Sequence, residues 1–218
     1  MKVLKRAFIT VGILFLIFSF IVVIAITNQG FRIVLEEGFY IASDSSYNLA
    51  HLSSDLIYTN HYNLKIKYLK IAVEDDRTLD IIKDDIGLSD FSLSYIQVTN
   101  KDSLIDLFQC EYLEAYIMTS NYDTFKSELF NLENSFQTKE VFLNYFLAKI
   151  LQNDFTNDQL IELSKIYYEK LDIDINSNDY SKVFIDYKIL ASIALHNKDI
   201  DTFNLFEANA LDVLTRID

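Results

Sequence analysis

The stretch that decides the fold is residues 179–216, DYSKVFIDYKILASIALHNKDIDTFNLFEANALDVLTR. Apolar residues recur at alternating spacings of four and three in its first half, and the pattern returns after the polar turn HNKD. That spacing is typical of a helix with one buried face. We therefore predict two antiparallel helices, 179–196 and 199–216. The residues of the two stripes are Tyr180, Phe184, Tyr187, Ala191 and Ala194, then Phe203, Phe206, Ala210 and Val213.

The same pattern extends upstream to residue 101 and predicts four more helices. Their expected ranges are 102–118, 122–134, 138–152 and 156–171. Asp102 is expected to cap the first of them, and Thr156 with Gln159 has the spacing of a capping box at the start of the fourth. Amphipathic helices joined by such short polar loops pack as antiparallel neighbours.

Glycine and proline are too scarce for a β-sandwich or barrel. Proline is absent, and the four glycines all lie at or before Gly87, whereas β-turns depend on these two residues. We therefore predict an all-α fold, with further helices at 43–58, 61–73 and 77–86 and with Gly87 ending the last of these at positive φ. Residues 91–98 alternate like a strand, but an isolated strand is unstable. We expect an irregular connector or part of a helix there.

The N-terminal segment predicts a transmembrane helix over about residues 7–27. Residues 7–26 read AFITVGILFLIFSFIVVIAI and carry no charge. Twenty helical residues span about 30 Å, the thickness of a hydrocarbon core. A cleaved signal peptide has a shorter apolar region and a small-x-small cleavage site. The nearest match, Ala25-Ile26-Thr27, is poor, so we expect an uncleaved anchor.

The charges that flank this segment predict its orientation. Lys2, Lys5 and Arg6 precede the run, and basic flanks stay in the cytoplasm. We expect a single-pass protein of the cell membrane, with a cytoplasmic N-terminus and an extracytoplasmic C-terminal domain. Its expected divisions are 1–30 (basic flank and anchor), 31–100 (a juxtamembrane, mostly helical segment) and 101–218 (helical hairpins). Gly30 and Gly38 are possible breaks within residues 27–42.

The charge beyond the anchor bears on partners. Three of the 19 basic residues and none of the 32 acidic ones precede residue 31, so the remainder has a formal net charge of −16. Such a domain avoids nucleic acid and anionic lipid and tolerates a basic partner. We therefore expect a protein or peptide partner and no nucleic acid.

Three loop-plus-helix segments resemble one another. They are NYDTFKSELFNLEN from Asn121, DFTNDQLIELSKIYY from Asp154 and DIDTFNLFEANALDV from Asp199. Residues 101–218 thereby resemble tetratricopeptide repeats, whose helical hairpins recur about every 34 residues. The chain departs from that family in lacking the Trp and Gly-Tyr signature, the terminal Pro and an even spacing, and a generic helical repeat or bundle stays open. The resemblance implies a concave groove for a peptide or protein and no catalysis.

One segment has the alternation of a calcium loop. Asp172, Asp174 and Asn176 fall in DIDINSND, residues 172–179, and oxygen ligands suit Ca²⁺. The full motif needs Gly at its sixth position and Glu at its twelfth. Ser177 and Val183 stand there, so we expect a polar loop whose Asn178 or Asp179 caps the next helix, and no metal or other cofactor.

No other pattern points to catalysis. Asp75-Asp76 and Asp84-Asp85 are expected at solvated helix ends. The lone Cys110 is expected on a helix, as a small residue of the hydrophobic core. The three histidines are scattered, and the chain contains no H-E-x-x-H, G-x-S-x-G or Gly-rich phosphate motif. We therefore do not expect an enzyme.

The function that these patterns favour is a membrane-anchored, extracytoplasmic interaction or scaffold module. One alternative is a sensor or sequestering protein of the immunity type, which binds a secreted peptide. A second is an envelope enzyme without a recognisable motif. Partner-binding candidates line the predicted hairpins, although each also suits the core: Tyr145, Tyr167, Tyr187 and Phe206.

Overall fold

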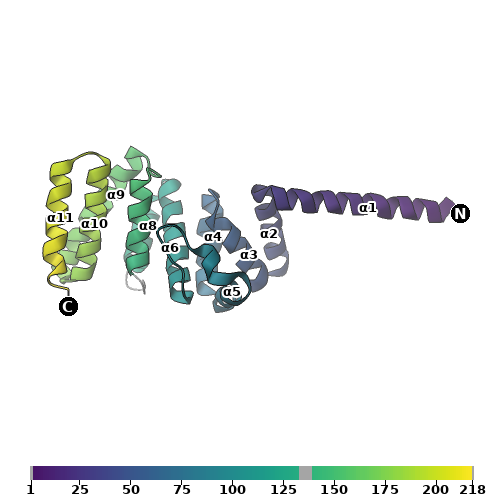
Figure 1. Ribbon diagram of the computed structural model, residues 1–218, viewed down its shortest axis with the longest axis horizontal. Coiled ribbons are helices and arrows are strands. Elements are labelled where there is room, and N and C mark those ends of the chain that lie inside the picture. The colour runs from purple at the N-terminus through teal and green to yellow at the C-terminus, as the bar shows by residue number, and fades with distance from the viewer. Residues whose placement is uncertain (1, 133–138, 218) are drawn as a thin grey trace.

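The computed structural model describes residues 2–132 and 139–217, and these form an elongated stack of α-helices with one long helix projecting from its end (Figure 1). The described residues contain no β-strand, so the predicted all-α class is confirmed. In the N-terminal part the helices are α1 (Lys2–Thr27), α2 (Gln29–Ser43), α3 (Ser46–Ile57), α4 (Tyr62–Glu74) and α5 (Asp76–Ile81). The C-terminal part comprises α6 (Lys101–Met118), α7 (Tyr122–Leu132), α8 (Lys139–Leu151), α9 (Asn157–Ser177), α10 (Tyr180–His196) and α11 (Ile200–Leu214).

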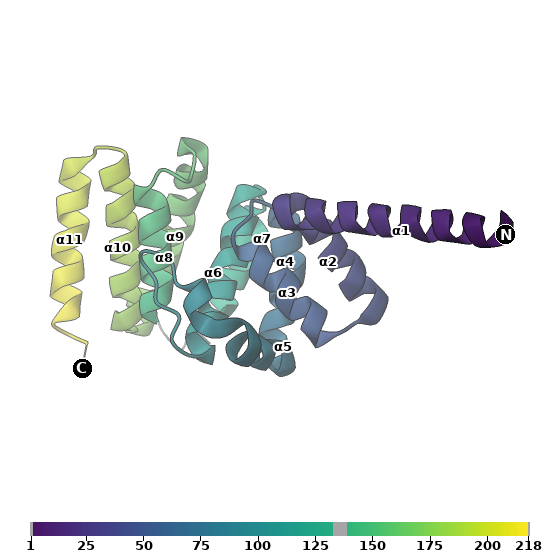
Figure 2. The same ribbon diagram turned by 45° about the vertical axis from the view of Figure 1, so that its right-hand side comes forward.

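The helices of the C-terminal part alternate between two roles. Helices α6, α8 and α10 pack on one another in succession, while α9 and α11 pack against α10. Helix α4 packs on α6 from the other side, which joins α2–α5 to the same stack. In the turned view of Figure 2, α10 and α11 form the end farthest from α1. One hydrophobic core therefore runs from Ile33 in α2 to Val213 in α11.

The turns are built without glycine or proline. Four residues with positive φ provide the reversals between C-terminal helices: Ser120, Asn153, Asn178 and Lys198. A left-handed residue at a helix C-terminus satisfies the last carbonyls, as where the N–H of Asp199 donates to the carbonyl of Ala194 at 2.9 Å. Because each of these residues has a side chain, each turn carries conformational strain that glycine would avoid.

Several predicted helix boundaries are wrong. The N-cap of α6 is Asn100 rather than Asp102, and it forms a capping box with Ser103. Helix α9 does not end near Leu171 but continues to Ser177, so most of the predicted loop 172–179 is helical. The capping box of Thr156 with Gln159 and the N-cap at Asp179 are confirmed. The predicted helix ends at Asn134 and Thr138 lie outside the described residues.

The middle of the chain contains the least regular structure. The predicted helix 77–86 is the short α5 followed by a π-helical turn, Ile82–Gly87, and Gly87 has the expected positive φ of 99°. A 3-10 helix, Leu88–Phe91, follows. The strand-like segment is an irregular connector, with one bridge between Leu93 and Ile96.

Helices α1 and α2 meet at an abrupt bend. Asn28 has an extended backbone, and its side chain accepts a hydrogen bond from the N–H of Phe31 at 3.0 Å. Helix α2 is continuous through Gly30 and Gly38, so the breaks considered there are absent from it. Over the described residues, no single helix is both long and apolar enough to cross a bilayer. A bent pair of helical segments would together be long and apolar enough to cross one, by length and composition alone. The two segments are Ile13–Thr27 and Gln29–Ser43, and the bend between them is 113°.

A candidate binding cleft

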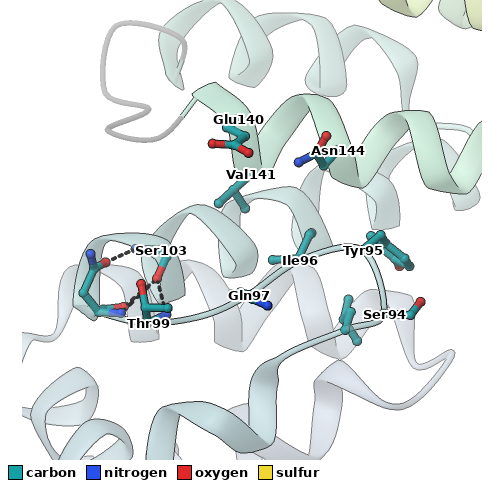
Figure 3. A pocket seen from close by; sticks show the side chains of 11 residues that line it. Ser94, Tyr95, Ile96, Gln97, Thr99, Ser103, Glu140, Val141 and Asn144 are labelled. Carbon is teal, nitrogen blue, oxygen red and sulfur yellow. Dashed lines mark hydrogen bonds between the residues drawn. The ribbon is translucent and has the colours of Figure 1, made fainter.

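A cleft of about 480 Å³ lies between the irregular segment before α6 and the first turns of α8 (Figure 3). Glu140, Val141 and Asn144 of α8 stand across from the residues of the irregular segment. The helical period places these three α8 residues on one face. The other side of the cleft is lined by Leu93, Ser94, Tyr95, Ile96, Gln97, Thr99, Asn100 and Ser103.

The irregular segment is held at both ends. Leu93 and Ile96 exchange two backbone hydrogen bonds of 2.9 and 3.2 Å, and the N–H of Val98 donates to Ser92 Oγ at 3.2 Å. At the other end Ser103 Oγ accepts from the backbone N–H groups of Thr99 and Asn100. Ile96 and Val98 are buried, whereas Gln97 and Thr99 are exposed. This side of the cleft is thus fixed by the core, with alternate side chains turned outward.

Polar groups on both sides of the cleft have no partner within the described part of the chain. The side chains of Gln97, Glu140 and Asn144 make neither a hydrogen bond nor an ion pair there, and the backbone of Gln97 makes no hydrogen bond. Asn144 is half-buried, so its amide is partly removed from water. Amide and backbone groups in such a position gain most from a ligand that supplies donors and acceptors.

Beneath the cleft lies a buried ionic cluster, defined here as Lys65, Glu111, Glu114, Tyr145 and Lys149. The ring of Tyr95 packs edge-on against that of Tyr145 at 6.4 Å between centroids, and the Tyr145 hydroxyl donates to Glu114. Lys149 pairs with Glu114 at 3.1 Å. These contacts connect the cleft wall to residues of α6 and α8.

The ionic cluster continues to α4 through Lys65. Its Nζ donates to Glu111 and to the carbonyl of Ile57, the latter at 3.4 Å, and both side chains of the Lys65–Glu111 pair are almost fully buried. Burial raises the pKa of Glu111, although Lys65 acts in the opposite direction. Burial also raises the pKa of Tyr145 well above its ordinary value. The hydroxyl of Tyr145 therefore stays protonated and is a hydrogen-bond donor.

The chemistry of the cleft suits binding. Its lining offers amides, hydroxyls, free backbone groups and one carboxylate, Glu140. The carboxylates of the ionic cluster are occupied by lysines and buried beneath the wall. Cys110 is fully buried, and that burial raises the pKa of its thiol, so its thiolate is disfavoured. Among the described residues, no three His, Cys, Asp or Glu side chains gather as metal ligands would.

The residues considered for calcium lie on the last turns of α9 rather than in a loop. Asp174 is paired with Lys170 at 2.6 Å and is buried. Asp172 is exposed, and its backbone carbonyl accepts from the side chain of Asn176 at 2.7 Å. A helix separates the side chains of successive alternate residues by about 200°, so the three do not face one point.

The four aromatic candidates are mostly parts of the core. Tyr145 and Tyr167 are fully buried, Phe206 is 7% exposed, and Tyr187 is half-buried. Tyr187 packs on Phe206 at 6.0 Å between ring centroids and lines a separate hollow of about 190 Å³. Tyr145 lies in the ionic cluster beneath the cleft, where its ring contacts those of Tyr95 and Phe146.

Sequence reasoning missed the residues that define the cleft. The alternation of residues 91–98 was its one usable signal, because it marks side chains that point outward from an extended segment. Glu140 and Asn144 gave no signal, since they are ordinary polar residues of an amphipathic helix. Comparison of the chain with protein-family models, with curated proteins and with solved structures finds no match.

Proposed function

We propose that this protein is a membrane-tethered, extracytoplasmic interaction module whose cleft binds an extended peptide segment of a partner. The observation that carries the proposal is the set of partnerless polar groups on both sides of one cleft. Gln97, Glu140 and Asn144 stand there on elements fixed by the core. The successive packing of α6, α8 and α10 supports the related proposal of a tetratricopeptide-like helical repeat.

An extended peptide fits these groups better than a compact ligand does. Main-chain groups of such a peptide can pair with the free backbone N–H and C=O of Gln97, in the manner of a strand added to an exposed edge. The Asn144 amide can both donate and accept. Glu140 favours a lysine or arginine side chain of the peptide, in agreement with the acidity of the whole domain.

The proposed tether is the transmembrane helix expected over about residues 7–27. The projection of α1 away from the stack supports it (Figure 1). Between Val11 and Ile26, large apolar side chains are exposed on every side of this helix. Phe15 and Leu16 are each 68% exposed and Phe18 is 65% exposed. A surface of that kind is stable in hydrocarbon and unfavourable in water. The basic residues of the N-terminal flank support a cytoplasmic N-terminus.

The test is selection of peptides on the detergent-solubilised full-length protein. A random peptide library is selected on wild-type protein, and the affinities of enriched peptides are measured for wild type and for Glu140→Lys. We expect enriched peptides to contain lysine or arginine and to bind the variant about tenfold or more weakly, as the loss of a charge-assisted contact predicts. Asn144→Ala should weaken the binding of the same peptides.

Asp158→Lys provides the matched control. Asp158 is also an exposed acidic residue in the first turn of a helix, but it lies on α9 outside the cleft. The Asp158→Lys substitution changes the net charge, and the charge in the first turn of a helix, as Glu140→Lys does. It should leave peptide binding unchanged. Equal weakening by both variants would mean that only overall charge matters. Absence of any selective peptide would contradict a peptide-binding cleft.

The same cleft serves the alternative of a protein that sequesters a secreted peptide. A photoreactive residue at position 97, used in intact membranes, separates the two roles. Crosslinking to another membrane protein favours the interaction module, and crosslinking to a small secreted peptide favours sequestration. We do not propose an envelope enzyme, because Glu140 is the one carboxylate among the described lining residues.

A further inference from the structure

Helix α2 has its polarity reversed relative to a helix on a water-exposed surface. Arg32, Glu36 and Glu37 turn toward the rest of the protein, whereas Val34 and Ile41 are 63% and 65% exposed. At 100° per residue, one outward face of α2 contains no charged side chain. The residues of this outward face are Phe31, Val34, Leu35, Gly38, Ile41 and Ala42, with Phe39 at its margin.

The charged residues of α2 are held inward by specific partners. Arg32 forms two hydrogen bonds with the carboxylate of Asp55 in α3, and Glu37 accepts from the hydroxyl of Tyr68 in α4 at 2.7 Å. Ile33, on the same inner side, is 1% exposed. The outward position of the apolar face is therefore fixed by packing and by ion pairs, and does not result from a freely rotating helix.

The direction of α1 indicates what covers this face. Helix α1 leaves the stack on the side of α2 opposite to α3 and α4, and the bend between α1 and α2 is 113° (Figures 1 and 2). If α1 lies along the membrane normal, α2 lies close to the plane of the membrane surface and leans back toward α1. Its apolar face is then turned to the bilayer, with the other helices beyond it.

We infer that α2 is an interfacial helix, which lies in the headgroup region of the bilayer and docks the helical stack end-on to the membrane. This inference rests on the proposed anchor. Helices with an apolar face bury it at the boundary between headgroups and acyl chains. The occupant is a lipid surface rather than a protein, because the apolar face continues directly from the exposed apolar surface of α1. The face itself has no charge, so zwitterionic lipid suffices and the acidic domain is held off anionic headgroups.

A path in which α1 and α2 together form one broken span is disfavoured by the same contacts. Such a path would take Arg32, Glu36 and Glu37 through hydrocarbon, at a high cost for each charge. It would also separate Ile33 from the core in which it is buried.

The test measures the depth of single positions in the full-length protein reconstituted in phosphatidylcholine vesicles. Val34→Cys and Ile41→Cys are labelled with an environment-sensitive fluorophore and quenched by lipids that carry a spin label near the headgroup or near the chain end. Phe18→Cys reports on the anchor, and Leu211→Cys, 65% exposed on α11, reports on a surface far from α2. Native Cys110 is fully buried and does not compete for the label.

We expect the shallow quencher to reduce emission at positions 34 and 41 severalfold more than at position 211, and to act there more strongly than the deep quencher. Position 18 should respond more to the deep quencher. If position 18 is quenched while 34 and 41 behave like 211, the interfacial helix is refuted and the anchor stands. Deep quenching at 34 and 41 would refute it in favour of a broken span. No quenching at position 18 would remove the anchor and the inference together.

Discussion

Removal of the Lys65 ammonium should destabilise the protein far more than removal of a surface lysine. Lys65 and Glu111 are 4% and 3% exposed at their side chains, so Lys65→Met leaves a carboxylate buried without its cation. Loss of one partner of a buried pair costs about 3–5 kcal/mol. For a domain of this size, that corresponds to a fall in Tm of about 6–20 °C.

The penalty should depend on pH in a defined direction. Burial already raises the pKa of Glu111 in the folded state, so the neutral carboxyl favours folding and the ionised carboxylate opposes it. The stability that the neutral form provides is therefore lost as the pH rises through that pKa. Lys65→Met raises this pKa further. The difference between variant and wild type should therefore be largest near pH 8 and should shrink as the pH is lowered toward 5.

The assay is urea and thermal unfolding of full-length protein in one detergent, followed by circular dichroism. Lys126→Met is the control, because Lys126 and Glu169 form an exposed pair at 2.6 Å, and such pairs contribute about 0–1 kcal/mol. The double variant Lys65→Met with Glu111→Met should recover most of the lost stability, since no carboxylate is then left without its cation and the Glu114–Lys149 pair is intact. The reasoning is refuted if Lys65→Met unfolds like Lys126→Met at pH 8, or if the double variant is less stable than the single one.

Three further predictions concern strained or buried positions and use the same unfolding assay. Burial and the neighbouring Asp55 raise the pKa of Glu36 from 4.5 to about 7. The stability that its neutral form provides is fully present below pH 4.5 and is lost by the time the pH has risen through 7, so Glu36→Gln should be more stable than wild type by about 1–2 kcal/mol at pH 8 and equal to it at about pH 4. Gly87→Ala should lower the free energy of unfolding by about 1–3 kcal/mol, because φ is 99° at that position. Gly38→Ala should raise it by about 0.5–1 kcal/mol, because Gly38 lies inside α2 with open space around the new methyl group. Lys198→Gly should stabilise by about 1 kcal/mol by relieving its φ of 60°, and a destabilising result would show that no strain resides in that turn.

The helices were predictable because their period is a local property of the sequence. Apolar spacing located six helices beyond residue 100, and each is present in the described residues. The turns were predictable only by position. Asn153 and Asn178 tolerate positive φ comparatively well, but nothing local marks Lys198 as a residue that will adopt it.

The end of α9 was not predictable from local sequence. DIDINSND resembles a loop because Asp and Asn favour turns over helices. In the structure, Lys170 is buried between Asp174 of the same helix and Asp186 of α10, at 2.6 and 2.7 Å. These contacts extend α9 by more than one turn past Leu171. A contact between residues of two helices thus outweighed the local preference of the segment.

The candidate cleft was unpredictable for a related reason. Its two sides are separated by about forty residues of chain, and neither side has a distinctive motif. The reversed polarity of α2 was also hidden, because an uncharged face next to the predicted anchor is interpreted simply as juxtamembrane sequence. Recognising it required the inward partners of Arg32 and Glu37, which come from α3 and α4.

The ionic cluster buries charged side chains between helices, where apolar side chains would avoid the cost of removing charge from water. Its position suggests a physical reason for this choice. Lys65, Glu111 and Lys149 belong to α4, α6 and α8, which are the helices that join the α2 end of the stack to its C-terminal hairpins. Leucines there would permit several packing registers, because apolar contacts are not directional. A shift by one helical turn would separate Lys65 from Glu111 and leave each charge buried without a partner. Such a shift would destabilise the fold by several kcal/mol. The ion pairs therefore disfavour a shifted register of α4, α6 and α8, the helices that support the cleft wall at Tyr145.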